Sequence, residues 1–251
     1  MWLFGLISLI STTEDAIPQV ELLDEVFSRF VNENGEVNYD ALRENPVNLK
    51  NFVEFLKKVS PVNHPERFPT NNDAKAYWIN AYNALVMISI VENPEIESVK
   101  DLGWGMGLFW RKTFLIGGRR MTLNQIERKI LRDVFADPRM HFAINCGSNS
   151  CPPLGQRIFS GEDLDQQLDE KARQFINNPE NVVIDRDEKI VWLSRIFKWY
   201  SEDFEAVSED VLHYIFQYLE GYSETEIEKI VNSYQVRYFT YDWSLNSTNG
   251  Q

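Results

Sequence analysis

The longest helical pattern in the chain, over residues 72–92, constrains the fold more than any other feature. Its apolar side chains recur every three or four residues, the spacing that places them on one helix face. They are Tyr77, Trp78, Ala81, Leu85 and Ile88. Asn72 or Asp73 is the expected N-cap, because both side chains accept hydrogen bonds from free amides of a first turn. Asn93-Pro94 ends the pattern, so the sequence predicts one long amphipathic helix.

Shorter helical patterns and strand signals fill the rest of the chain. Helices are expected over 20–32, 47–59, 123–136, 163–177, 194–204, 207–219 and 223–233. Hairpins are expected over 113–122 and 182–193, with further strands at 141–145 and 235–241. Because helices outnumber strands and the strands pair mainly as hairpins, the sequence predicts the α+β class. The expected fold is a mainly helical single domain with a small, mostly antiparallel sheet.

Composition and organisation favour one domain. The chain has 251 residues, 43% of them hydrophobic, which is enough to bury a sizeable core. It has no internal repeat and no linker rich in Gly, Ser or Pro. We therefore expect a single domain over residues 17–246, with a leading helical arm at 17–60 and a disordered tail at 247–251.

Charge and the N-terminus bear on partners and location. The formal net charge of −13 argues against nucleic acid as a partner, because the phosphate backbone would be repelled. An apolar run opens the chain but is shorter than the about 20 residues that span a bilayer. Residues 1–16 are therefore predicted to be a signal or anchor segment, and no later segment is apolar enough to cross a membrane. These cues leave export and a cytoplasmic location as alternatives.

The segment from His141 to Leu154 concentrates reactive side chains. It holds an imidazole, both cysteines of the chain, Ser148 and Ser150. Cys146 follows the strand expected at 141–145, and loops at strand ends often carry functional sites. A nucleophilic thiol needs a neighbour that lowers its pKa, and His141 is the histidine close to it in sequence.

Strand geometry complicates the pairing of these two residues. Side chains alternate along a strand, so His141 would face one side of the sheet and Cys146 the other. The pair would meet only if the chain bends before Cys146. Glu127 or Asp137 would then orient the imidazole. A structural explanation stays open, in which Glu127 closes a capping box with Asn124 and His141 is a core histidine.

The cysteine pair allows more than one interpretation. Cys146 is a reactive thiol, with or without Cys151 as its partner, or the two form a disulfide that pins the loop of an exported protein. A metal site built from Glu127, His141 and both cysteines is chemically allowed but weakly motivated, because four residues separate the cysteines and few further ligands exist. Neither a metal nor a cofactor is predicted.

Asn80 and Asn83 lie three residues apart in the apolar helix pattern. Two buried carboxamides on one helix face need hydrogen-bond partners. Buried amides mostly bond to backbone, so tying down a neighbouring loop is the favoured interpretation. In the functional alternative they join Trp78 in orienting a substrate or a catalytic imidazole.

Several segments resemble a known family. The resembling motifs are Trp78-Ile-Asn-Ala-Tyr-Asn83, Leu123-Asn-Gln-Ile-Glu127, Pro138-Arg-Met-His-Phe-Ala143, Ser150-Cys-Pro-Pro-Leu154, Leu193-Ser-Arg-Ile-Phe-Lys-Trp-Tyr200 with Asp203-Phe204, and Tyr241-Asp-Trp-Ser-Leu-Asn246. Over roughly 18–246 the chain resembles the family catalogued as domain of unknown function 547. Because members of that family are commonly exported bacterial proteins, the resemblance implies a periplasmic or extracellular location. Arg128 stands where the family often has a histidine.

The leading hypothesis is a cysteine-dependent hydrolase or acyl transferase that acts on an amide or thioester of a small molecule or peptide. Cys146 is the nucleophile, His141 the base and Glu127 the orienting group, and Asn80 or Asn83 donates to the developing oxyanion. The other candidate substrate-binding residues are Trp78, Ser148 and Arg132. The rival hypothesis is a non-catalytic binding or scaffold domain with a structural Cys146–Cys151 disulfide. The oligomeric state is left open.

Overall fold

The computed structural model describes residues 17–103 and 105–248. The signal or anchor segment expected at 1–16 lies outside the described residues. Within them, no helix is both long and apolar enough to cross a membrane.

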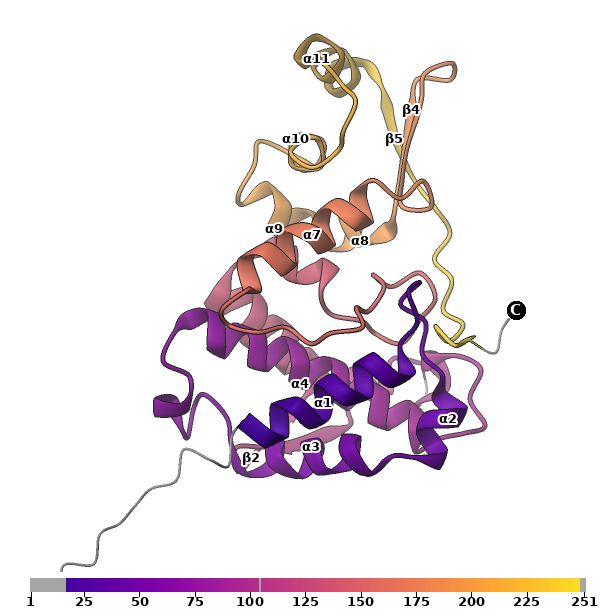
Figure 1. The fold of residues 1–251 in the computed structure, drawn as a ribbon. Helices are drawn as coiled ribbons and strands as arrows, with labels where there is room; N and C mark the ends of the chain where they lie inside the picture. The colour runs from indigo at the N-terminus through magenta and orange to yellow at the C-terminus, as the bar shows by residue number, and fades with distance from the viewer. Residues whose placement is uncertain (1–16, 104, 249–251) are drawn as a thin grey trace, which may run out of the picture.

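A buried helix forms the centre of one half of the molecule. Helix α4 spans Asn71–Val91, and every residue from Lys75 to Val91 is buried. Its predicted position is confirmed, but the expected amphipathic face is wrong, because neighbours cover the helix on all sides. The predicted N-cap is also wrong: Thr70 caps the helix in a capping box with Asp73. Around α4 lie α1 (Ile17–Phe30), α2 (Tyr39–Glu44) and α3 (Val47–Lys58) (Figure 1).

Two small sheets, mostly antiparallel, accompany the helices in the described chain. Strands β1 (Thr113–Ile116) and β2 (Arg119–Thr122) form the expected hairpin around Gly117-Gly118. Strands β3 (Val182–Asp185) and β4 (Ile190–Leu193) form the second hairpin. Strand β5 (Gln235–Tyr238) joins β4 in parallel, with Val191 opposite Val236. The predicted α+β class with a mainly helical content is confirmed.

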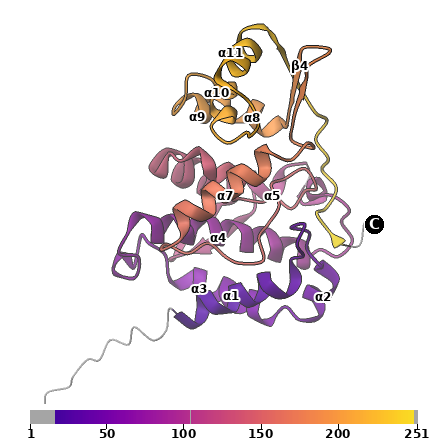
Figure 2. The ribbon, with the colours of Figure 1, turned by 45° about the horizontal axis from the view of Figure 1, so that its top comes forward.

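The remaining helices lie mostly in the second half of the chain. They are α5 (Gly107–Trp110), α7 (Leu164–Ile176), α8 (Arg195–Trp199), α9 (Ser201–Glu205), α10 (Val211–Phe216) and α11 (Glu224–Ser233), with short 3-10 turns η2 (Pro65–Arg67) and η3 (Val99–Asp101). Figure 2 shows α8 to α11 and β4 at one end of the molecule, α1 to α3 at the other, and α7 across the middle.

The helix expected at 123–136 begins in α6 (Leu123–Gln125) and continues as the π-helix η4 (Ile126–Phe135). Thr122 caps it, in a capping box with Gln125. The capping box predicted for Asn124 and Glu127 is therefore wrong, and the Glu127 carboxylate is available for other contacts.

The strand predicted at 141–145 is also wrong. Asp137 caps a 3-10 helix, η5 (Pro138–Phe142), and an irregular segment follows. The Asn83 side chain takes the backbone hydrogen bonds that a neighbouring strand would have supplied. The alternation that placed His141 and Cys146 on opposite faces therefore does not apply.

Two hydrophobic clusters make up the core. The first surrounds α1, α3 and α4, and the second surrounds Phe142, Phe175, Phe197 and Phe204. The expected free tail does not begin at 247, because Ser247 pairs with Val37 in an isolated bridge and the Thr248 amide donates to the Val37 carbonyl.

Candidate functional site

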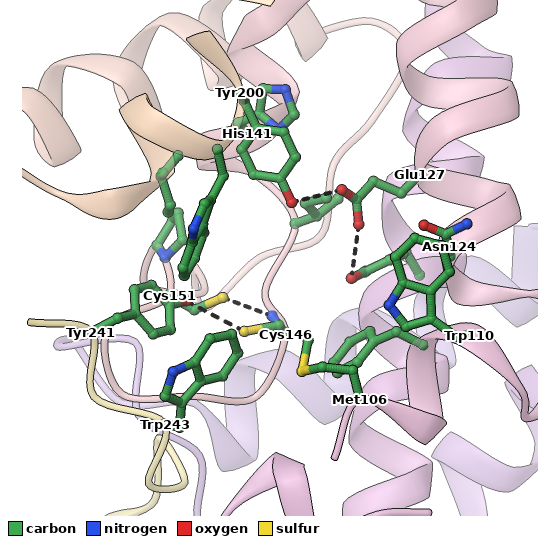
Figure 3. A pocket seen from close by; sticks show the side chains of 16 residues that line it. Met106, Trp110, Asn124, Glu127, His141, Cys146, Cys151, Tyr200, Tyr241 and Trp243 are labelled. Atoms are coloured by element: carbon green, nitrogen blue, oxygen red, sulfur yellow. Dashed lines mark hydrogen bonds between the residues drawn. The ribbon is translucent and has the colours of Figure 1, made fainter. Parts of the chain in front are cut away.

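A pocket of about 360 Å³ lies where the two hydrophobic clusters meet, and both clusters contribute to its walls. Tyr82 comes from α4, Trp110 from α5, Glu127 from η4, and Trp199 from α8. The loop that carries Cys146 and the C-terminal segment with Tyr241 and Trp243 complete the lining (Figure 3).

The Cys146 sulfur is surrounded by hydrogen-bonding groups. Its Sγ lies 2.9 Å from the Ser148 hydroxyl and 3.5 Å from the Tyr241 hydroxyl. The Ser148 hydroxyl is itself 3.0 Å from that of Tyr241, so the three groups form one cluster. Burial opposes ionisation of the Cys146 thiol, but hydrogen bonds from Cys151, Ser148 and Tyr241 outweigh it and lower the pKa to about 7. This sulfur is therefore the acidic thiol of the pocket.

Cys151 lies beside it with a different ionisation. Both cysteines are free thiols in the structure. The backbone amide of Cys146 donates to the Cys151 Sγ at 2.9 Å. Burial, together with the hydrogen bond and the charge of Cys146, raises the pKa of the Cys151 thiol well above its usual value. A thiolate on Cys146 and a neutral thiol on Cys151 are the favoured pair.

The loop around Cys146 is fixed by carboxamide side chains. Asn83 donates to the Ala143 carbonyl at 3.0 Å and accepts from the Asn145 amide at 2.8 Å. Asn145 in turn accepts from the Gly147 amide and donates to the Pro152 carbonyl. Gly147 has φ +83°, and a Cβ there would lie 2.5 Å from Ile90 Cδ1, so the turn after Cys146 requires glycine.

Asn80 and Trp78 lie away from this pocket's lining. Asn80 donates to the Phe159 carbonyl at 2.7 Å and accepts from the Phe159 amide at 3.0 Å. Trp78 is buried with its ring edge-on to Tyr77. Asn80 and Asn83 thus bond to the backbone of neighbouring loops, as the favoured interpretation predicts. Neither lines the pocket that holds Cys146.

Glu127 faces the pocket and is held by two phenols. Its carboxylate accepts from the Tyr200 hydroxyl at 2.7 Å and from the Tyr82 hydroxyl at 3.4 Å. Burial raises the pKa of both phenols, and the charges of Glu127 and Cys146 raise it further. The charges of Glu127 and Cys146 both act on the phenols of Tyr82 and Tyr200, so the carboxylate and the thiolate lie close enough to influence the same groups.

His141 lines the same pocket, but its contacts differ from the prediction. Its Nε2 lies 2.7 Å from Asp203 Oδ2, and its ring stacks on Tyr200 with centroids 3.8 Å apart. Its Nδ1 is buried without a hydrogen-bond partner. In Figure 3 the imidazole lies with Tyr200 at the top of the view, and the Cys146 and Cys151 sulfurs lie below them beside Tyr241. The structure pairs His141 with Asp203 rather than with Cys146.

Asp203, the partner of His141, was not connected with the imidazole by the sequence. Glu127 and Asp137, the two predicted orienting groups, bind elsewhere; Asp137 pairs with Lys75 and Arg139. Arg132, expected near a substrate, holds Asp203 with two hydrogen bonds of 2.5 and 2.7 Å. Burial opposes ionisation of Asp203, but hydrogen bonds from His141 and Arg132 hold its pKa well below the usual range.

The other missed residues are Tyr82, Tyr200 and Tyr241, all in segments that carry the family resemblance. Spacing along the chain gave no sign that their hydroxyls meet around a thiol and a carboxylate. Within the described residues, no group of three His, Cys, Asp or Glu side chains is arranged to hold a metal ion.

The fold and the pocket define a mainly helical α+β domain with an acidic thiol and a carboxylate in one aromatic-walled pocket. Residues 66–176 match the family described as "Protein of unknown function, DUF547", which confirms the resemblance over that range. Comparison with curated proteins and with solved structures found no match.

Proposed function

We propose that this domain is a thiol-dependent hydrolase or acyl transferase that acts on an amide or thioester, with Cys146 as the nucleophile. One observation carries the proposal: the Cys146 sulfur lies in a pocket, hydrogen-bonded to hydroxyls that favour its thiolate. With a pKa of about 7, much of this thiol is ionised at neutral pH without a base beside it.

In the first half of the reaction the thiolate attacks the acyl carbon and forms a C–S bond. The resulting tetrahedral intermediate breaks its bond to the amine or thiol, which takes a proton from solvent water as it leaves, and a thioester to Cys146 remains. In the second half, water or an acceptor attacks this thioester, loses a proton and releases Cys146. The acyl group is thereby transferred with no change of oxidation state.

Glu127 is the base that fits the second half. Its carboxylate lines the same pocket and is oriented by Tyr200 and Tyr82. A carboxylate has lone pairs beyond those that two phenols use, so it can also accept a proton from water. His141 then acts indirectly: its ring packs on Tyr200 and so helps to orient the Tyr200 hydroxyl toward Glu127.

The test is intact-protein mass spectrometry after incubation with an activated acyl thioester. The proposal requires an added acyl mass on Cys146, found by peptide mapping, that is lost in Cys146→Ser and kept in Cys151→Ser. The adduct should persist longer in Glu127→Gln, since deacylation loses its base.

The rival hypothesis, a non-catalytic domain pinned by a Cys146–Cys151 disulfide, gives a different result. Protein purified without reductant would then carry a quantitative disulfide that resists mild reduction, and no acyl adduct would form. Either finding would overturn the proposal. Export stays a prediction that the mass of the mature N-terminus can test.

A further inference from the structure

The charged groups that line the pocket, among the described residues, are negative. Among the described residues that line it there is no lysine or arginine, while Glu127 and the Cys146 thiolate are negative. Two cations touch its wall residues without lining the pocket. Arg132 lies over Tyr200 but is paired with Asp203, and Lys100 lies over the Trp243 ring with Nζ 4.3 Å from the centroid.

The walls are largely aromatic. Trp199, Tyr241 and Trp243 form a cluster with ring centroids 4.5 to 5.6 Å apart. Figure 3 shows Trp110 across the pocket from Tyr241 and Trp243, with the Cys146 sulfur between them. Trp110 is 54% exposed and Trp199 43% exposed, whereas most large apolar side chains of the described chain are buried. Exposed rings that flank a reactive group are a binding surface for an apolar or aromatic group.

We infer that this pocket selects acyl donors whose acyl group is aromatic or bulky and aliphatic and carries no negative charge. The inference rests on the proposed function and names its substrate class. An apolar acyl group would be buried between the tryptophans as Cys146 attacks. A carboxylate on the same group would lose hydration, meet no cation among the described lining residues and face Glu127, so its binding would be penalised.

Three thioesters of N-acetylcysteamine test this: 3-phenylpropanoyl, its para-carboxylate and acetyl. We measure kcat/KM from thiol release and the rate of acyl-enzyme formation from intact mass. The phenylpropanoyl donor should exceed each of the other two by about tenfold or more. The advantage over the para-carboxylate should shrink as salt rises from about 20 mM to 500 mM, whereas the advantage over acetyl should persist.

A matched pair of variants locates the effect. Trp110→Lys places a cation at the rim and should raise the rate ratio of carboxylate to neutral donor about tenfold. Val207 is 51% exposed, lies between α9 and α10 and does not line this pocket, so Val207→Lys adds the same charge elsewhere and should leave the ratio unchanged. Equal rates for all three donors, or equal shifts in both variants, would overturn the inference.

Failure of the proposed function gives a separate signature. In that case no donor yields an adduct on Cys146, although iodoacetamide still labels it. Tryptophan fluorescence then measures binding without chemistry, using Cys146→Ser with 3-phenylpropanamide and its para-carboxylate. Binding of the neutral amide about tenfold tighter than the carboxylate would support the selectivity in the absence of catalysis. Equal binding, or none, would refute it.

Discussion

The substitution Ser148→Ala tests how much the hydroxyl cluster, beside Cys151, lowers the pKa of the Cys146 thiol. Ser148 is fully buried, and its hydroxyl lies 2.9 Å from the Cys146 sulfur. A hydrogen bond to a charged group contributes roughly 1.5–3 kcal/mol, which corresponds to about 1–2 pKa units. Without the Ser148 hydroxyl, one hydrogen bond fewer offsets the cost of burying the Cys146 thiolate. We expect the ionisation midpoint of Cys146 to move from about 7 to roughly 8–9.

The assay is the pH dependence of alkylation by iodoacetamide, with Cys146 and Cys151 quantified separately by peptide mass spectrometry. The rate at a single pH is a poor measure, because a less acidic thiolate is intrinsically more nucleophilic. For a shift of about 1.5 units this gain is roughly fivefold, and it offsets much of the loss of thiolate at neutral pH. The fitted midpoint is free of that compensation.

Ser150→Ala is the matched control. Ser150 lies in the same loop, but its hydroxyl accepts from the Asp242 amide and does not contact the sulfur. Its removal should leave the Cys146 midpoint at the wild-type value. If Ser148→Ala titrates like the wild type, or if both substitutions shift the midpoint equally, the hydroxyl cluster does not explain the acidity.

Three further predictions follow from the contacts of the site. His141→Gln should leave the alkylation midpoint of Cys146 within about 0.5 units, because the imidazole bonds Asp203 rather than the sulfur; a rise above about 8 would restore His141 as its base. Asn83→Ala and Asn80→Ala should each lower the free energy of unfolding by about 2–4 kcal/mol in urea, since each removes two buried backbone hydrogen bonds, but only Asn83→Ala should disturb the Cys146 titration. The pKa of Asp203 is lower in the folded chain than in the unfolded one, so ionised Asp203 stabilises the fold above about pH 4, and this stabilisation is lost as the pH falls towards the folded pKa. Asp203→Asn should lower the free energy of unfolding by about 1–3 kcal/mol at pH 7 and flatten the acid side of the curve of unfolding free energy against pH. An unchanged curve would contradict this.

Local signals predicted most of the secondary structure. Helix α4 and both hairpins were expected near their observed bounds, because apolar spacing and Gly117-Gly118 act within a few residues. The parallel pairing of β4 with β5 was not predicted. Between these two strands the chain passes through α8 to α11, and no local pattern specifies which edge it returns to.

The errors at the site have the same origin. The apolar residues of 141–145 predicted a strand, but they are buried at the end of η5 and in the irregular segment after it, where the backbone bonds to the Asn83 side chain, about 60 residues earlier. Likewise, sequence offered Glu127 and Asp137 as partners for His141, and the observed partner is Asp203, 62 residues away. The spacing of residues along the sequence predicts which side chains share a face of one helix or strand. These contacts instead join elements that are far apart in the sequence and that only the fold brings together.

The position of the pocket also determines how much of the chain the chemistry needs. The segment that matches the family, residues 66–176, contains Cys146, Glu127 and Tyr82. Two of the groups around them come from outside it: Tyr241 contacts the sulfur, and Tyr200 orients Glu127. Both belong to the second hydrophobic cluster, so the Tyr241 contribution to the acidity of the thiol, and the Tyr200 contact of Glu127, depend on the packing of the two clusters. The proposed chemistry therefore needs the α+β domain up to the C-terminal segment, because residues 66–176 by themselves would hold the thiol without Tyr241 and Glu127 without Tyr200.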